Sequence, residues 1–180
     1  MATKTFTSTT LSASDLNTYC ANSGLVYVTQ VTVGSGVSSV TVSSCFSSTY
    51  DAYKIVYTAG ISSTTDWSYF QLAGLTGANY FSQGFYNTSG NGTYNAMSRS
   101  SATTWQIATV TAQSFGWEMT VHNPFLAKFT FFTADGASDY AMSRTGGVCN
   151  TATSSTGFTI STGGGTITGG TITVYGFRKA

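Results

Sequence analysis

The chain has 180 residues, of which 41 % are hydrophobic and only 7 % are Asp, Glu, Lys or Arg, against roughly 25 % charged residues in a typical soluble domain. This length fits one domain, because two halves would each be short of apolar residues for a core. The seven Lys and Arg residues are scattered, so the basic cluster that nucleic acid requires is missing. No apolar stretch approaches the ~20 residues of a membrane span, and the N-terminus lacks the apolar segment of a signal peptide. We therefore expect neither nucleic acid as a partner nor membrane insertion. We expect the protein to be synthesised in a cytoplasm without a signal peptide.

Hydroxyl side chains replace charges as the source of polarity. The chain holds 33 Thr and 25 Ser residues, and its formal net charge is +1. A surface with so little net charge gives weak protection against association. We therefore expect a protein whose natural state is an assembly, a homo-oligomer of this chain.

The N-terminal residues 1–24 are expected to form a polar arm followed by a short helix that anchors the protein. Ser12 to Asp15 has the spacing of a capping box. Leu16 and Tyr19 then fall on one helical face, which is stable only if it packs against something. Leu11, Leu16 and Tyr19 are the candidate anchoring residues.

From residue 25 to residue 180 the pattern indicates an all-β domain. Short segments rich in β-branched and aromatic residues alternate with Gly, Asn and Asp, which is typical of an antiparallel sandwich or barrel. The expected turns lie at 74–77, 87–92, 123–124, 135–136 and 146–147. The expected strands are 25–33, 37–42, 53–58, 68–75, 80–86, 104–111, 115–122, 127–133, 137–144, 157–161 and 166–177.

Residues that could carry chemistry are few. There are six acids, one histidine (His122) and three cysteines without the spacing of a zinc site. We expect no catalytic residues, no metal and no cofactor, and buried thiols at Cys20, Cys45 and Cys149. A polysaccharide-cleaving enzyme and an ice-binding surface remain alternatives. The chain has few of the acidic residues that such an enzyme needs, and it lacks the regular Thr repeat that an ice-binding surface needs.

Aromatic residues give the stronger signal. Adjacent pairs such as Tyr80-Phe81 and Phe85-Tyr86 point to opposite faces of a strand, so one member of each pair leaves its own sheet's core. Such rings serve a subunit interface, a platform for glycans or a second packed layer within the chain. The candidate contact residues are Tyr80, Phe85, Tyr86, Asn91 and Tyr94.

Three segments resemble the small structural proteins of tailed-bacteriophage virions, above all those of aquatic phages and cyanophages. They are Thr9-Thr-Leu-Ser-Ala-Ser-Asp-Leu-Asn17, Cys45-Phe-Ser-Ser-Thr-Tyr-Asp-Ala-Tyr-Lys-Ile-Val56 and Thr171-Ile-Thr-Val-Tyr-Gly-Phe-Arg178. The resemblance implies a jelly-roll-like antiparallel β-sandwich, commonly trimeric, in a tail fibre or appendage or in a head decoration protein. Such proteins carry no fixed catalytic residues, so none transfers to this chain.

The expected function is therefore that of a non-enzymatic structural virion protein, a tail-appendage component that contacts the host surface. The first alternative is a capsid decoration (cement) protein that stabilises the head, and the second is a glycan-binding module. The expected partners are other copies of the chain, as a trimer, other virion proteins of the tail or capsid, and a host-surface glycan. The expected location is the virion, after synthesis in the host bacterial cytoplasm.

Overall fold

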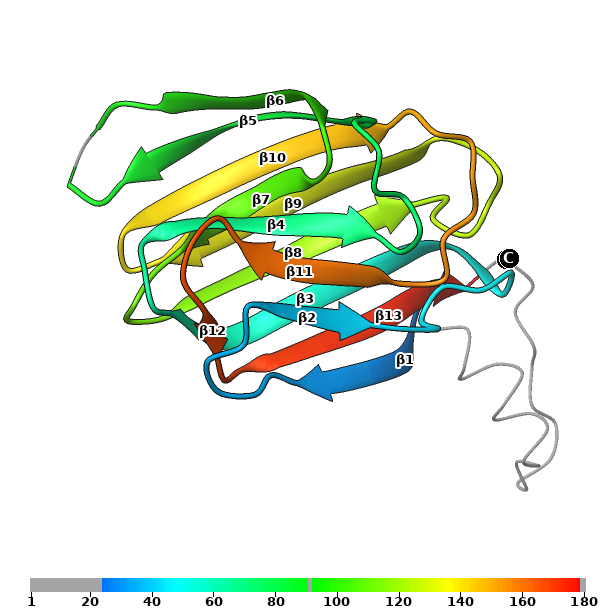
Figure 1. Ribbon diagram of the computed structural model, residues 1–180, viewed down its shortest axis with the longest axis horizontal. Coiled ribbons are helices and arrows are strands. Elements are labelled where there is room, and N and C mark those ends of the chain that lie inside the picture. The colour runs from blue at the N-terminus through cyan, green and yellow to red at the C-terminus, as the bar shows by residue number, and fades with distance from the viewer. Residues whose placement is uncertain (1–23, 91, 179–180) are drawn as a thin grey trace, which may run out of the picture.

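A computed structural model describes residues 24–90 and 92–178, which form thirteen strands and no helix (Figure 1). The helix expected before residue 24, with Leu11, Leu16 and Tyr19, lies outside the described residues. So does Cys20. The strands are β1 (Leu25–Thr32), β2 (Ser39–Val42), β3 (Tyr50–Ser62), β4 (Asp66–Leu72), β5 (Tyr80–Thr88), β6 (Asn95–Ala102), β7 (Trp105–Val110), β8 (Phe115–His122), β9 (Thr130–Ser138), β10 (Ala141–Cys149), β11 (Phe158–Thr162), β12 (Ile167–Thr168) and β13 (Thr171–Arg178).

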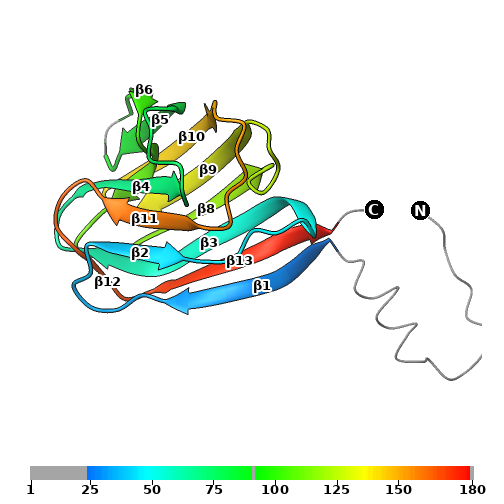
Figure 2. The same ribbon diagram turned by 45° about the vertical axis from the view of Figure 1, so that its right-hand side comes forward.

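The strands form two antiparallel sheets that face each other. The larger sheet has nine strands in the order β1-β13-β3-β8-β9-β10-β5-β6, with β12 paired to β3. The smaller sheet has the order β2-β11-β4-β7 and lies over one face of the larger sheet (Figure 2). The expectation of an all-β, two-sheet architecture is confirmed. Among the described residues, no helix has the length and apolarity needed to cross a membrane.

Alternation of buried and exposed residues explains why these segments form strands. On β8, Phe115, Trp117, Met119 and Val121 are buried, and the residues between them lie on the outward face. β7 is the exception, because all six of its residues are buried. It packs against β8, β9 and β10 and also against β5 and β6, so the larger sheet covers this edge of the smaller one.

A continuous stack of aromatic rings runs through the core between the sheets. Phe46 packs on Phe158 at 5.7 Å between ring centroids, and Phe158 stacks on Phe70 at 4.6 Å. Phe70 then stacks on Trp105 at 5.8 Å, and Trp105 contacts Phe132 of the larger sheet at 4.5 Å. Since each buried ring removes a large apolar area from water, this stack is a main source of stability.

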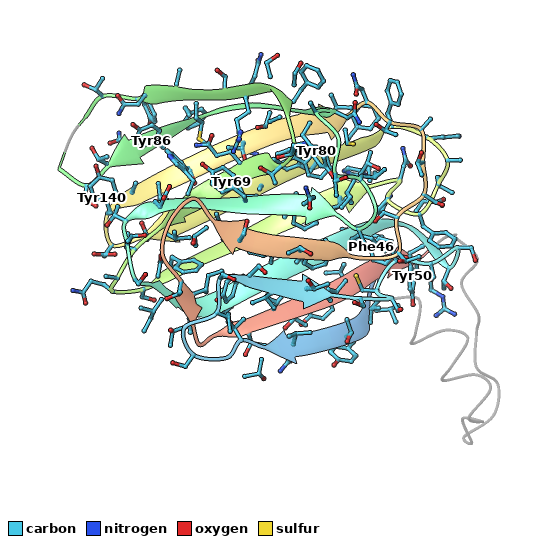
Figure 3. The ribbon with its side chains drawn as sticks, in the orientation of Figure 1. Phe46, Tyr50, Tyr69, Tyr80, Tyr86 and Tyr140 are labelled. Carbon is cyan, nitrogen blue, oxygen red and sulfur yellow. The ribbon has the colours of Figure 1, made fainter. Side chains whose placement is uncertain are left out.

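The segment that precedes β3 forms a corner, which we call the tyrosine corner (Phe46, Ser47, Tyr50, Tyr53 and Gly176). The Tyr53 hydroxyl accepts a hydrogen bond from the Ser47 amide at 2.7 Å and donates one to the Ser47 carbonyl at 3.0 Å. The Tyr50 ring meets Tyr53 edge-on and covers Gly176 of β13, where a Cβ would lie 2.4 Å from the ring. Figure 3 shows Phe46 and Tyr50 at this corner. The corner therefore fixes where the chain enters β3.

Two expected turns are wrong. Residues 135–136 lie inside β9 and residues 146–147 inside β10, and the chain turns at 139–140 instead. Close packing requires these glycines: a Cβ at Gly136 would lie 2.4 Å from the Ala108 Cβ, and one at Gly147 would lie 2.0 Å from the Phe81 carbonyl. Strand β6 was not expected, because its small polar residues lack an apolar alternation.

The thiols of Cys45 and Cys149 are free and buried, as expected. Burial raises the pKa of Cys45 to about 12 and also raises the pKa of Cys149. Both thiols therefore act as small apolar side chains of the core.

Candidate functional site

The structure separates the expected contact residues. Tyr80 is 0 % exposed; its hydroxyl donates to the Leu75 carbonyl at 2.7 Å and accepts from the Leu72 amide at 3.0 Å. The contact role expected for Tyr80 is therefore wrong, because Tyr80 is the inward member of its pair and Phe81 is the partly exposed one. Asn91 lies outside the described residues.

Phe85 and Tyr86 do point to opposite faces of β5. The Tyr86 ring packs edge-on against Trp67 of the smaller sheet at 5.0 Å, so its contact lies within the chain. Phe85 is 44 % exposed on the other face and meets Tyr94 edge-on at 5.2 Å. Of the five expected residues, the structure thus brings Phe85 and Tyr94 together.

These two rings border a hollow of about 590 Å³ on the outward face of the larger sheet, the face turned away from β2, β4, β7 and β11. Met142 is 70 % exposed and Tyr94 is 69 % exposed, although both have large apolar side chains. The volume falls within the range of about 300–1,000 Å³ that is common for ligand pockets. We call this hollow the aromatic groove and define it by Phe85, Asn87, Tyr94, Asp135, Met142 and Arg144.

A second hollow continues the aromatic groove across the strands. It measures about 410 Å³ and shares Asp135 and Met142 with the first. From there it extends over Gly116 of β8 to Val56 of β3. The absence of a side chain at Gly116 leaves the floor of this part open.

Four charged side chains form a row on the same face. Lys54 pairs with Glu118 at 2.8 Å, and Arg144 pairs with Asp135 at 3.4 Å. Glu118 and Asp135 are directly opposite each other in the β8–β9 pairing. The row carries two positive and two negative charges, so it is neutral as a whole.

The wall of the aromatic groove is tied to a neighbouring turn. The Ser89 amide donates to the Tyr140 carbonyl at 2.7 Å, and the Ser89 hydroxyl donates to the Asp139 carbonyl at 2.9 Å. The Asp139 carboxylate in turn accepts a hydrogen bond from the hydroxyl of Thr111, the residue that follows β7 of the smaller sheet. Figure 3 shows Tyr86 and Tyr140 at this end of the molecule, where the turns after β5 and β9 meet.

The arrangement suits binding better than acid–base chemistry. Glu118 and Asp135 are the neighbouring carboxylates, but both are half exposed and each forms an ion pair. A glycoside hydrolase needs one carboxyl group in apolar surroundings as a general acid. His122 is exposed at the end of β8, opposite Phe131. Within residues 24–90 and 92–178, no group of three or more His, Cys, Asp or Glu residues could hold a metal ion.

Sequence reasoning missed Asp135, Met142 and Arg144. The sequence predicts a turn at 135–136 and a strand over 137–144, whereas Asp135 lies inside β9 and β10 runs on to Cys149. β10 buries the small residues Ala141, Ser143 and Thr145 and exposes Met142 and Arg144, so no apolar alternation marked the full length of this strand in the sequence.

No protein-family model matches the chain, and no curated protein matches it in sequence.

Proposed function

We propose that this chain is a non-enzymatic structural protein of a tailed-bacteriophage virion, a tail fibre or tail-appendage component that assembles as a trimer. In this proposal residues 1–24 anchor the protein to other virion proteins, and the sandwich is exposed and contacts the host surface. The chain would be made in the host bacterial cytoplasm and act on the particle.

The observation that carries the proposal is the position of two segments that resemble virion proteins. Residues 45–56 and 171–178 are far apart in sequence, yet β3 and β13 are neighbours, paired from Tyr50–Arg178 to Thr58–Thr171. Tyr50 of the first segment covers Gly176 of the second. The two segments thus form one structural unit, as expected if the resemblance reflects a shared fold.

The order in which the chain visits the sheets supports a jelly roll. β2, β4, β7 and β11 belong to the smaller sheet, and the strands between them belong to the larger one. If β8, β9 and β10 together take the place of one strand, β2 to β11 make eight strands, with the first and last paired. Jelly rolls of this kind are common in viral capsid and lectin domains. Fold alone does not assign function, so the particle experiment below is needed.

The exposed apolar residues near the start of β1 support the anchoring role. Leu25 and Tyr27 of β1 are exposed, as is Phe177 of β13, the cross-strand partner of Leu25. We call these three residues the β1 edge patch. It lies at the start of β1, which directly follows the proposed anchoring residues in the sequence, so it is suited to a contact with a further subunit or virion protein.

Two measurements test the proposal. Analytical ultracentrifugation of the full chain should give three times the 18.9 kDa of the monomer. Gold-labelled antibodies against the chain should mark the tails of phage particles that carry its gene, and deletion of residues 1–24 should abolish the label while the protein stays folded. Label on the head would favour the capsid decoration alternative, and particles without label would contradict both.

A further inference from the structure

We propose that the aromatic groove is a binding site for a linear, neutral oligosaccharide laid across the strands of the larger sheet. The proposal concerns the isolated protein and does not depend on its place in a virion.

The rings provide a surface for one face of a sugar. Tyr94 meets Phe85 edge-on, and 69 % of the residue stays exposed. A pyranose presents C–H groups on its faces and hydroxyls around its rim. The aromatic groove matches this pattern, because Tyr94, Phe85 and Met142 provide apolar contact and Asn87 lies beside them in the lining.

The charges indicate a neutral ligand. Arg144 is paired with Asp135 across β9 and β10, so the lining offers no unpaired cation for a phosphate, sulfate or uronic acid. An apolar ligand would cover this pair and leave the remaining donors of Arg144 and acceptors of Asp135 without hydrogen bonds. Hydroxyl groups satisfy both, since a carboxylate accepts and a guanidinium donates.

These ion pairs have little to do with stability. The side chains of the Lys54–Glu118 and Arg144–Asp135 pairs are between 29 % and 67 % exposed. Exposed pairs of this kind contribute little to folding. In a chain with 7 % charged residues, four of these residues form one row on this face, and Asp135 and Arg144 of the row line the aromatic groove with the exposed rings, which a ligand would explain.

The shape indicates a chain of several sugars. The two hollows share Asp135 and Met142 and together run from β3 over β8, β9 and β10 to β5. Four strand steps at about 4.8 Å span roughly 19 Å, which is longer than a single sugar ring. The bonds from Ser89 to the 139–140 turn hold the end of β5 beside the aromatic groove in place before a ligand arrives.

The test uses the purified full-length protein on a panel of soluble oligosaccharides. The neutral probes are gluco-, manno-, galacto- and xylo-oligosaccharides from monosaccharide to hexasaccharide, and the charged probes are oligouronates and sulfated oligosaccharides of the same lengths. We expect binding to at least one neutral series, stronger for the hexasaccharide than for the disaccharide, and no binding of the charged probes.

The variants locate the site. Tyr94→Ala should weaken binding by on the order of tenfold or more, whereas Tyr94→Phe should keep most of it. Phe129→Ala is the control, because Phe129 is an exposed ring (46 %) in the segment between β8 and β9 that lines neither hollow, and the variant should bind like the unmodified protein. If Tyr94→Ala misfolds, Met142→Ala removes another apolar side chain from the same groove.

Three results would overturn the proposal. The first is an absence of binding to every neutral probe, and the second is a preference for the charged probes. The third is unchanged affinity in both Tyr94→Ala and Met142→Ala. None of these results bears on whether the chain assembles or joins a particle, so the virion proposal stands or falls separately.

Discussion

The tyrosine corner and the aromatic groove are both built from aromatic side chains, but they use them in opposite ways. In the corner, Tyr53 is 0 % exposed and its hydroxyl makes two hydrogen bonds to the Ser47 backbone. In the groove, Tyr94 and Met142 have the highest exposed fractions among the exposed large hydrophobic residues of the described chain. A buried ring whose hydroxyl is hydrogen-bonded stabilises the fold. A ring that is open to solvent is available to contact a partner.

This difference gives the two regions separate readouts. Changes in the corner and the core behind it should lower the free energy of unfolding, and changes in the groove should leave it unchanged while they alter binding.

The largest effect is expected for Trp105→Ala. Trp105 is 0 % exposed and contacts Phe70, Tyr80 and Phe132, so its removal leaves a large cavity in the ring stack. The free energy of unfolding should fall by about 3–5 kcal/mol, measured by chemical denaturation. A loss below about 1 kcal/mol would mean that the stack does not carry the core.

Gly176→Ala tests the contact between β13 and the tyrosine corner. The new Cβ would lie 2.4 Å from the Tyr50 ring, which must then move, at an expected cost of about 1–3 kcal/mol. The cost should shrink when the same change is made in a Tyr50→Ala background, as measured by a double-mutant cycle. Equal costs in the two backgrounds would show that Tyr50 does not rest on Gly176.

High pH should destabilise the buried region. Burial raises the pKa of Cys45 from 9.0 to about 12 and that of Tyr57 from 10.0 to about 12. Because both groups are neutral below these values and charge more easily when unfolded, their contribution is complete below pH 9 and is lost as the pH rises through 12. The free energy of unfolding should therefore fall by about 1–2 kcal/mol between pH 8 and pH 10. In Cys45→Ala this fall should be smaller, and a fall as large as in the unmodified protein would contradict the assignment to Cys45.

Tyr53→Phe should have a smaller effect. It keeps the ring that packs on Phe46 at 4.7 Å and removes the hydroxyl that bonds to both backbone groups of Ser47. We expect a loss of about 0.5–1.5 kcal/mol in denaturant unfolding. Tyr94→Phe is the matched control, and an equal loss in both variants would remove the distinction between the two hydroxyls.

Tyr94→Ala and Met142→Ala should be the least damaging. Both side chains are about 70 % exposed, so the free energy of unfolding should change by less than about 0.5 kcal/mol. Thermal unfolding of the two variants beside Trp105→Ala measures this directly. Unfolding temperatures several degrees below that of the unmodified protein would show that these two side chains contribute to the stability of the fold.

The sequence contained more about the fold than about the site. Alternation located most strands, because one face of each is buried and the other is not, as on β8. It failed where glycines inside strands imitate turns, at Gly136 and Gly147, whose role is the close approach of neighbouring chains. It also failed at β6, where polar residues leave no pattern to read.

The aromatic groove shows why the sequence did not predict all the residues of the site. The adjacent pair Phe85-Tyr86 revealed that one ring must leave the core, and this holds for Phe85. Its neighbours across the sheet depend on the register, which pairs Phe85 with Arg144 and Arg144 with Asp135. A shift of one residue would have turned these side chains to the other face, and no local feature of the sequence fixes that pairing.

A backbone-amide NMR titration tests whether the aromatic groove binds an oligosaccharide while the tyrosine corner only stabilises the fold. The protein is titrated with the neutral hexasaccharide that binds most tightly. Shifts should be confined to residues of the aromatic groove, led by Tyr94, Met142 and Arg144, with the β1 edge patch and the tyrosine corner unchanged. Shifts concentrated at Tyr27 and Phe177, or spread evenly over the sandwich, would contradict binding at the aromatic groove.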